Sequence, residues 1–237
     1  MSADKYIVAG IGDDSGGVRY SAVLPSVGVN WRVMPALSLH ASAGRGNETP
    51  TLNELACRPP GSVPTTGLNL SLLPVRSDSV EIGAKWRRDG VSAKLALFDT
   101  KTKDEIVVIS NSGGRSAFAN AGRTQRRGIE LSTRAQFDPW VKGLQWELAA
   151  NTLDARYRDG FKTCGASPCS VPSVLVAAGN RLPGVANRAA WTELKWTHTS
   201  GVYIAAEVKH QGCIIANDVG DESVNAVTSL GARIGVQ

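Results

Sequence analysis

The segment Gly143–Asn151, GLQWELAAN, alternates between apolar and polar side chains. Its even positions, residues 144, 146, 148 and 150, are apolar, whereas Gln145, Glu147 and Asn151 are polar. Successive side chains of a β-strand point to opposite faces, so this pattern predicts a strand with one apolar face and one polar face. Helical spacing does not fit the segment.

The same alternation recurs along the whole chain. It is clearest in residues 80–87 (VEIGAKWR) and 201–210 (GVYIAAEVKH), and shorter copies lie near residues 27–33, 129–134 and 193–196. We predict about nine strands from these patterns and from the turn-forming residues that flank them. The predicted strands cover residues 18–33, 36–46, 76–88, 91–108, 116–137, 143–157, 184–198, 201–214 and 226–236.

Strand length and loop length both favour a membrane barrel. Several strands exceed the roughly 5–6 residues usual in soluble sheets and reach the ~9–11 residues that a tilted strand needs to cross a membrane. Tight turns, near residues 34–35, 89–90, 138–139 and 199–201, alternate with long polar segments around 47–75, 109–115, 158–183 and 215–225. Short turns on one side and long loops on the extracellular side are typical of outer-membrane barrels.

The predicted fold is therefore all-β, an antiparallel transmembrane β-barrel segment of about nine strands that belongs to a larger barrel and is open if alone. We expect residues 18–237 to form this partial barrel and residues 1–17 to be an irregular N-terminal segment, the remnant of an extracellular loop. Loops 47–75 and 158–183 are expected on the extracellular side.

Composition excludes other membrane and nucleic-acid classes. Mean hydropathy is −0.11 in 237 residues, and no apolar run is long enough for a transmembrane helix. The net charge of +5 is spread along the chain without the basic block of a nucleic-acid-binding tail. Met1–Gly17 lacks the basic start and apolar core of a signal peptide, so we expect export to depend on a preceding segment.

The charged face of the predicted strands is expected to line a wet lumen, with the apolar face toward lipid. A soluble β-sandwich would instead bury the apolar face in a core and expose the charged face to water. The tryptophans on the apolar face fit either arrangement. The predicted lumen-facing residues are Glu81, Lys85, Lys94, Glu130, Arg134, Glu193, Lys195, Glu207 and Lys209.

Two cysteines, Cys164 and Cys169, lie close together in a polar stretch that contains Gly165 and Pro168. A disulfide that closes a short loop is the interpretation we favour, and it implies an oxidising compartment such as the periplasm or cell surface. Zinc would need further Cys or His at matching spacing, which this stretch lacks. The sequence does not pair Cys57 and Cys213.

Several short motifs resemble TonB-dependent outer-membrane receptors. They begin with Gly44–Gly46 followed by Glu48–Leu55, and continue in order through 76–86, 102–106, 120–122, 128–130, 178–184 and 217–218. Each motif is weak alone, but their order and spacing are specific. The motif residues are Gly44, Arg45, Gly46, Thr49, Pro50, Glu54, Asn120, Gly122, Gly128, Glu130, Gly179, Pro183 and Gly184.

The resemblance implies a receptor in the outer membrane that binds a scarce nutrient, most often a ferric siderophore, and imports it with energy from the TonB system. It implies no cofactor and no nucleic-acid partner. Most motif residues also have a structural interpretation at strand bends and ends. The family pattern further includes a plug domain, 22 strands and a terminal aromatic residue, whereas this sequence ends in RIGVQ.

Other classes of function have less support. The sequence contains no phosphate-binding Gly-rich loop, nucleophile elbow or metal-binding His pair, so we do not expect an enzyme. A non-transporting fragment, a carbohydrate-binding or adhesive sandwich and a passive porin remain alternatives. Solubility without detergent would favour the sandwich, because exposed apolar strands precipitate or need micelles.

Overall fold

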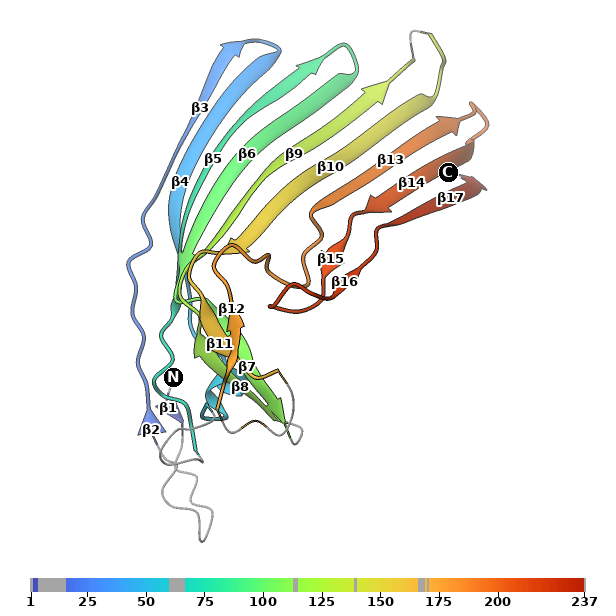
Figure 1. Cartoon of the computed structure of the whole chain (residues 1–237). Helices are drawn as coiled ribbons and strands as arrows, with labels where there is room; N and C mark the ends of the chain where they lie inside the picture. Colours follow the sequence, from blue (N-terminus) through green and yellow to red (C-terminus); the bar gives the residue numbers. More distant parts are fainter. Residues whose placement is uncertain are drawn as a thin grey trace.

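The computed structural model describes residues 2–3, 16–59, 67–112, 115–138, 140–165, 169 and 171–236, and its centre is one nine-stranded antiparallel sheet (Figure 1). Each strand of this sheet pairs with the nearest sheet strands in sequence, which makes the sheet a meander. The predicted all-β fold with nine long strands is confirmed. The strands are β3 (Ser26–Met34), β4 (Leu37–Glu48), β5 (Val75–Arg88), β6 (Val91–Lys103), β9 (Thr124–Gln136), β10 (Leu144–Tyr157), β13 (Arg188–Thr197), β14 (Val202–Gln211) and β17 (Val227–Val236).

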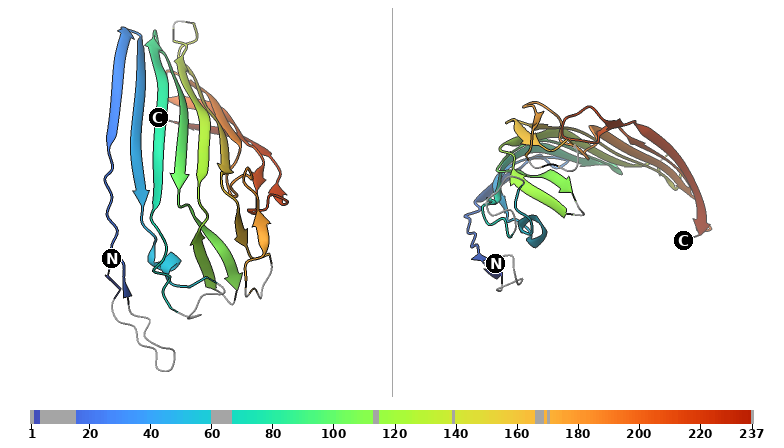
Figure 2. Two further views of the ribbon diagram at one scale, coloured as in Figure 1. Left: turned by 60° about the vertical axis from the view of Figure 1, so that its left-hand side comes forward. Right: turned by 60° about the horizontal axis from the view of Figure 1, so that its bottom comes forward.

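The sheet curves into an open trough and does not close into a barrel (Figure 2). Strands β3 and β17 form its two edges, and within the described part of the chain neither edge pairs with another strand of the sheet. The interior of the trough is the face that carries the charged side chains.

Tight turns and long loops are sorted to opposite ends of the sheet (Figure 1). Residues 35–36, 89–90, 137–143 and 198–201 connect strands at one end, where the structure describes all but residue 139. Asp89 and Gly90 have φ angles of 48° and 79°, the left-handed pair that a two-residue hairpin turn requires. Residues 49–74, 104–123, 158–187 and 212–226 connect strands at the other end.

Two predicted strands were too long. The expected strands 91–108 and 116–137 each divide, because the chain leaves the sheet at Asp104, where φ is 58°. Residues Ile106–Ser112 (β7) and Arg115–Asn120 (β8) then pair with each other as a separate hairpin, so the predicted loop 109–115 lies largely within strands. The predicted strands 18–33 and 184–198 also start late, at residues 26 and 188, and the strand 201–214 ends at residue 211.

Small elements build the loop end of the molecule. They are the one-turn helix α1 (Leu52–Leu55) and three two-stranded pairs: β1 (Ser2–Ala3) with β2 (Gly16–Gly17), β11 (Phe161–Thr163) with β12 (Val174–Val176), and β15 (Ile214–Ile215) with β16 (Ser223–Val224). The rest of the predicted N-terminal segment 1–17 lies outside the described residues. No described helix has the length and apolar character to cross a membrane.

The convex face carries an apolar band. On β5 the band consists of Val80, Ile82, Ala84 and Trp86, and on β6 of residues 91, 93, 95 and 97. Ile82 is 58% exposed and Leu230 on the edge strand is 80% exposed, so this face has no protein cover in the described structure. Seven residues of a strand span about 23 Å, close to the ~25 Å apolar band of outer-membrane barrels.

Glycines on the concave face make room for large side chains of the neighbouring strand. The ring of Phe98 lies over Gly128, where a Cβ atom would come within 2.8 Å of Phe98 Cζ. His40 lies over Gly83 in the same way, and a Cβ there would also meet Leu95 O at 2.5 Å. These contacts are closer than real Cβ atoms make, so both positions require glycine.

We therefore expect Gly128→Ala to destabilise the sheet by about 1–3 kcal/mol, because the new methyl group has no space between Phe98 and the backbone of β10. Unfolding of the chain by denaturant in micelles, followed by tryptophan fluorescence, measures this. Gly28→Ala is the matched control, since its nearest neighbours would lie at 3.6 and 3.7 Å, an ordinary contact distance. Equal midpoints for the two variants would contradict the steric explanation.

Candidate binding site on the concave face

The nine residues predicted to face the lumen all lie on the concave face of the sheet. Directly opposed residues of paired strands share a face, and the register connects the nine through such pairs: Lys85 with Lys94, Lys94 with Ser132, and Glu193 with Glu207. Residues of the opposite parity form the apolar band. The alternation in the sequence therefore assigns the charged side chains to the concave face and the apolar side chains to the convex face of the sheet.

A row of three carboxylates crosses the concave face. Glu147 on β10, Glu193 on β13 and Glu207 on β14 are direct cross-strand partners. Like charges in this position repel, and each carboxylate has a basic neighbour that offsets the repulsion. The ion pairs are Arg134 Nη2 to Glu147 Oε1 at 2.8 Å, Arg233 Nη2 to Glu193 Oε2 at 2.6 Å and Lys209 Nζ to Glu207 Oε1 at 3.0 Å.

Burial and an aromatic side chain fix this row further. Glu193 is only 7% exposed, although it lies on a face that is open to solvent. Trp191 Nε1 donates a hydrogen bond to Glu207 Oε2 at 3.0 Å. A Cβ atom at Gly231 would lie 2.8 Å from Glu207 Oε1, so the glycine of the edge strand leaves room for the carboxylate. The row is a preformed polar surface with its charges in fixed positions.

Two further cations of this face have no such partners. Lys85 and Lys94 oppose each other directly across β5 and β6, and neither forms an ion pair within the described part of the chain. Lys195 Nζ lies 4.5 Å from the centre of the Tyr203 ring. His40 Nε2 is 3.1 Å from Glu81 Oε1. Glu130, between Ala96 and Asn151 in the register, also has no ion pair among the described residues.

The concave face contains a hollow of about 890 Å³ that reaches from β4 to β17. His40, Glu81, Lys85, Lys94, Glu130, Trp191 and Lys209 are in its lining. The described residues contain no group of three or more His, Cys, Asp or Glu side chains arranged to hold a metal ion. The hollow suits a polar, hydrogen-bonding occupant held by charges of both signs.

The loops at the open end share a small core of their own. Ala121, Ala155, Tyr157, Val176 and Leu182 are buried together, and the rings of Tyr157 and Phe161 meet edge to face at 5.0 Å. The Tyr157 hydroxyl donates to Asp218 Oδ1 at 2.6 Å. Asn180 Nδ2 donates to the carbonyls of Asp218 and Val219 at 3.1 and 2.8 Å. These bonds join the loop after β14 to the loop after β10.

Asn120 and Gly122, two of the family-motif residues, fix the loop between β6 and β9. Asn120 Nδ2 donates to the carbonyls of Leu73 and Asp104 at 3.0 and 2.7 Å, and its Oδ1 accepts from Leu73 N at 2.9 Å. Gly122 has a φ of 87°, and a Cβ atom there would lie 2.8 Å from Asp159 Oδ2. Both residues shape the loops.

Other motif residues have similar structural positions. Thr51 and Glu54 form a capping box at α1, Pro50 is fully buried, and Thr49 is exposed. Arg45 Nε donates to Asp78 Oδ1 at 2.8 Å on the outer face, between Gly44 and Gly46. Gly179 and Gly184 have φ angles of 96° and 75°, and Gly184 N, just after the half-buried Pro183, donates to Ile215 O at 2.9 Å.

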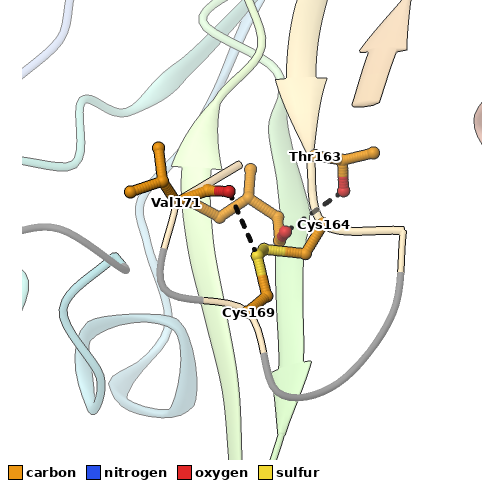
Figure 3. The surroundings of a disulfide bond; sticks show 5 residues. Thr163, Cys164, Cys169 and Val171 are labelled. Atoms are coloured by element: carbon orange, nitrogen blue, oxygen red, sulfur yellow. Dashed lines mark hydrogen bonds between the residues drawn. A yellow bond between two sulfur atoms is a disulfide. The ribbon is translucent and has the colours of Figure 1, made fainter. Parts of the chain in front are cut away.

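Cys164 and Cys169 are joined by a disulfide at the end of β11, with their Cα atoms 6.0 Å apart (Figure 3). Cys164 N and Thr163 Oγ1 both donate to Ile109 O, at 2.8 and 3.1 Å, so this segment is tied to β7. Residues 166–168 and 170 lie outside the described residues. Cys57 is half-buried and Cys213 is exposed, both as free thiols.

Sequence reasoning missed the contacts between loops. Tyr157 and Asp218 are 61 residues apart, and no local pattern marks either one. It also missed Trp191 and Arg233 as partners of the carboxylate row. Glu147 was recognisable as a polar residue in an alternating strand, but its pairing depends on the register.

The class of protein follows from these observations: a curved antiparallel sheet with an apolar convex face, a charged concave face and loops gathered at one end is part of an outer-membrane β-barrel. The sequence model of the family described as TonB dependent receptor-like, β-barrel, matches residues 3–231. The chain therefore belongs to the β-barrel family of TonB-dependent receptors. Members of this family are outer-membrane transport receptors.

Individual relatives share the fold. The pesticin receptor of Yersinia enterocolitica is 29% identical over 96 residues, which is 40% of this chain and 14% of the relative. The ferric yersiniabactin uptake receptor FyuA from Yersinia pestis superposes with a TM-score of 0.68 at 19% identity, covering 95% of this chain and 31% of FyuA. The siderophore receptor PiuA from Acinetobacter baumannii gives 0.68 at 18% identity, covering 87% and 28%. The chain thus spans less than a third of each.

The Arg123–Asp159 pair predicts a pH dependence in the loops. Bonds from the side chain and backbone N–H of Arg123 lower the pKa of Asp159 to about 2. A lowered carboxyl pKa means that the pair contributes stability above the ordinary value near ~3.9 and loses it as pH falls through 2. Titration of the Asp159 carboxyl carbon by NMR measures this midpoint. Arg123→Gln should raise it, whereas Arg115→Gln, on an exposed arginine, should not. An unchanged midpoint in Arg123→Gln would refute the assignment.

The Tyr157–Asp218 bond predicts that the two loops move together. Tyr157→Phe keeps the ring but removes the donor, and a hydrogen bond to a charged group contributes about 1.5–3 kcal/mol. We expect amide hydrogen exchange in residues 214–224 to accelerate by roughly ten- to a hundredfold. Tyr203→Phe on the concave face is the control and should leave these residues unchanged. The same exchange rates in wild type and Tyr157→Phe would rule out the coupling.

Proposed function

We propose that this chain forms part of the wall and outer loops of an outer-membrane receptor that takes up a ferric siderophore, or a similar scarce nutrient, with energy from the TonB system. The family membership supports receptor-mediated transport. Two structural relatives are a ferric yersiniabactin uptake receptor and a siderophore receptor. Another is the copper transporter OprC, so the class of nutrient is the more specific part of the proposal.

The observation that carries the proposal is the division of one sheet into two unlike faces. The convex face presents apolar side chains that are exposed, such as Ile82 and Leu230, and lipid is the solvent that stabilises them. The concave face carries the charged row and the hollow. A soluble sandwich would bury the apolar face under a second sheet, and the described residues form no such cover.

The binding surface for the nutrient is proposed to lie at the loop end. There hydrogen bonds join the loops around Tyr157, Asn180 and Asp218, and a disulfide joins Cys164 and Cys169 directly after β11. We propose that loops 47–75 and 158–183 face the outside of the cell. The concave face below would contact the protein segment that fills the lumen of a complete receptor.

The chain by itself is not proposed to transport. Among the residues that the structure describes, strands β3 and β17 have no partner at the outer edges of the sheet, and each unpaired backbone group costs several kcal/mol in lipid. We expect the isolated chain to remain an open sheet that needs detergent or pairs with other chains.

A chimeric receptor tests the function. The segment of FyuA that matches this chain is replaced by residues 18–236, and the chimera is expressed in cells that lack their own ferric siderophore receptors. We expect uptake of at least one labelled ferric siderophore, abolished when the energy-coupling protein TonB is deleted. Uptake that continues without TonB would indicate a passive pore, and an assembled chimera without any uptake would contradict the proposal.

The same chimera reports its own orientation. The exposed thiol of Cys213 lies at the loop end, so an impermeant thiol reagent added to intact cells should label it in a Cys57→Ser background. A Ser200→Cys change at a tight turn, combined with Cys213→Ser, should be protected. Labelling of Ser200→Cys with protection of Cys213 would place the loops on the wrong side and reject the proposed topology.

A further inference from the structure

The apolar band on the convex face ends at charged residues toward the loops. On successive strands the next outward position after the band is Arg45, Asp78, Asp99, Arg127 or Asp154. Basic residues predominate beyond this boundary, with Arg76, Lys101 and Lys103 outward on β5 and β6. Arg76 and Lys103 oppose each other directly. Counted together, the boundary positions and those just beyond it carry five basic and three acidic side chains, so the belt that they form has an excess of positive charge.

Three arginines of this belt converge on one carboxylate. Arg156 Nε lies 2.7 Å and Arg181 Nη2 4.0 Å from Asp154 Oδ1, while Arg127 Nη2 lies 3.2 Å from Asp154 Oδ2. Arg156 Nη1 also donates to Gly179 O at 2.8 Å. Asp154 can balance only one of the three charges. The side chains of Arg127, Arg156 and Arg181 are 59%, 35% and 35% exposed, so all three remain accessible to a further anionic ligand.

A hollow of about 670 Å³ lies beside these arginines on the same face. Leu97 and Ile129, two exposed residues of the apolar band, contribute to its lining together with Thr152. Asp99 also lines the hollow, but Gln125 Nε2 donates to both of its carboxylate oxygens at 2.7 Å. Three arginines against two carboxylates leave the hollow positive, and Lys101, opposite Gln125 in the register, adds to this charge.

We propose that this hollow binds a phosphate-bearing lipid of the surrounding membrane. The guanidinium groups of Arg127, Arg156 and Arg181 would hold the phosphate, since arginine presents paired N–H donors that match phosphate oxygens. The acyl chain would run along Leu97 and Ile129 toward the turn end of the sheet. The site lies on the convex face, so it is separate from the concave hollow and independent of which nutrient the receptor takes up.

The loop position of Arg181 gives such a lipid a structural effect. Arg181 belongs to the loop after β10 and pairs across an isolated bridge with Arg156. Two residues earlier, the carbonyl of Gly179 accepts a hydrogen bond from Arg156. Asn180, which lies between them in sequence, donates hydrogen bonds to the carbonyls of Asp218 and Val219. A phosphate on the three arginines would therefore attach the loop layer to the membrane surface as well as to the sheet.

Native mass spectrometry of the 237-residue chain in micelles tests the site. The probes are dioleoyl phosphatidic acid, dioleoyl phosphatidylcholine as the zwitterionic lipid, and inorganic phosphate. We expect phosphatidic acid to bind at least tenfold more tightly than phosphatidylcholine, and inorganic phosphate to compete only weakly. The triple variant Arg127→Gln/Arg156→Gln/Arg181→Gln should lose this preference.

A matched control separates a site from bulk charge. The variant Arg32→Gln/Arg87→Gln/Lys195→Gln removes the same charge from the concave face and should keep the preference. If the triple variant loses its strand signal in circular dichroism, the single loop variant Arg181→Gln replaces it in the experiment. We expect Arg181→Gln to weaken binding of phosphatidic acid at least threefold. Equal loss in the concave-face control, equal binding of inorganic phosphate and lipid, or full binding by Arg181→Gln would each overturn the proposal.

Discussion

The structure depends on one constraint, that every backbone N–H and C=O group placed in hydrocarbon needs a partner within the protein. The nine long strands satisfy it by pairing in sequence order, and within the described part of the chain the outer edges of β3 and β17 have no partner strand in this sheet. Once the strands are paired, the two faces follow from their period of two. Apolar side chains collect on the convex face and charged ones on the concave face, and a shift of the register by one residue would exchange the faces.

The concave face shows how charge is accommodated on such a sheet. Its large side chains alternate with glycine, alanine and serine on neighbouring strands, so that Phe98 lies over Gly128 and the Glu207 carboxylate lies next to Gly231. This complementarity allows three glutamates to stand side by side with basic partners. The Lys85 and Lys94 pair lacks such partners within the described structure, and Glu81 and Glu130 line the same hollow.

Much of the sheet could be predicted from the sequence, because alternation reports the extent of a strand and the face of each side chain without any knowledge of partners. The error at Asp104 arose where the alternation stops. Residues 106–109 are all apolar, and such a run does not show whether the chain stays in the main sheet or pairs as a separate hairpin. The cysteine pair was accessible because its members are five residues apart. Tyr157 with Asp218, and Arg181 with Asp154, were inaccessible because tertiary structure alone brings them together.

The sorting of short and long connections also bears on how the sheet assembles. Strand pairs joined by tight turns, such as β5 and β6 through Asp89 and Gly90, need to close only a few residues, so their loop-closure entropy is small. Pairs such as β10 and β13, separated by residues 158–187, must bring together the ends of a much longer segment. By this measure the sheet consists of four hairpins with low closure entropy and one further strand, and joining one hairpin to the next carries the larger entropic cost.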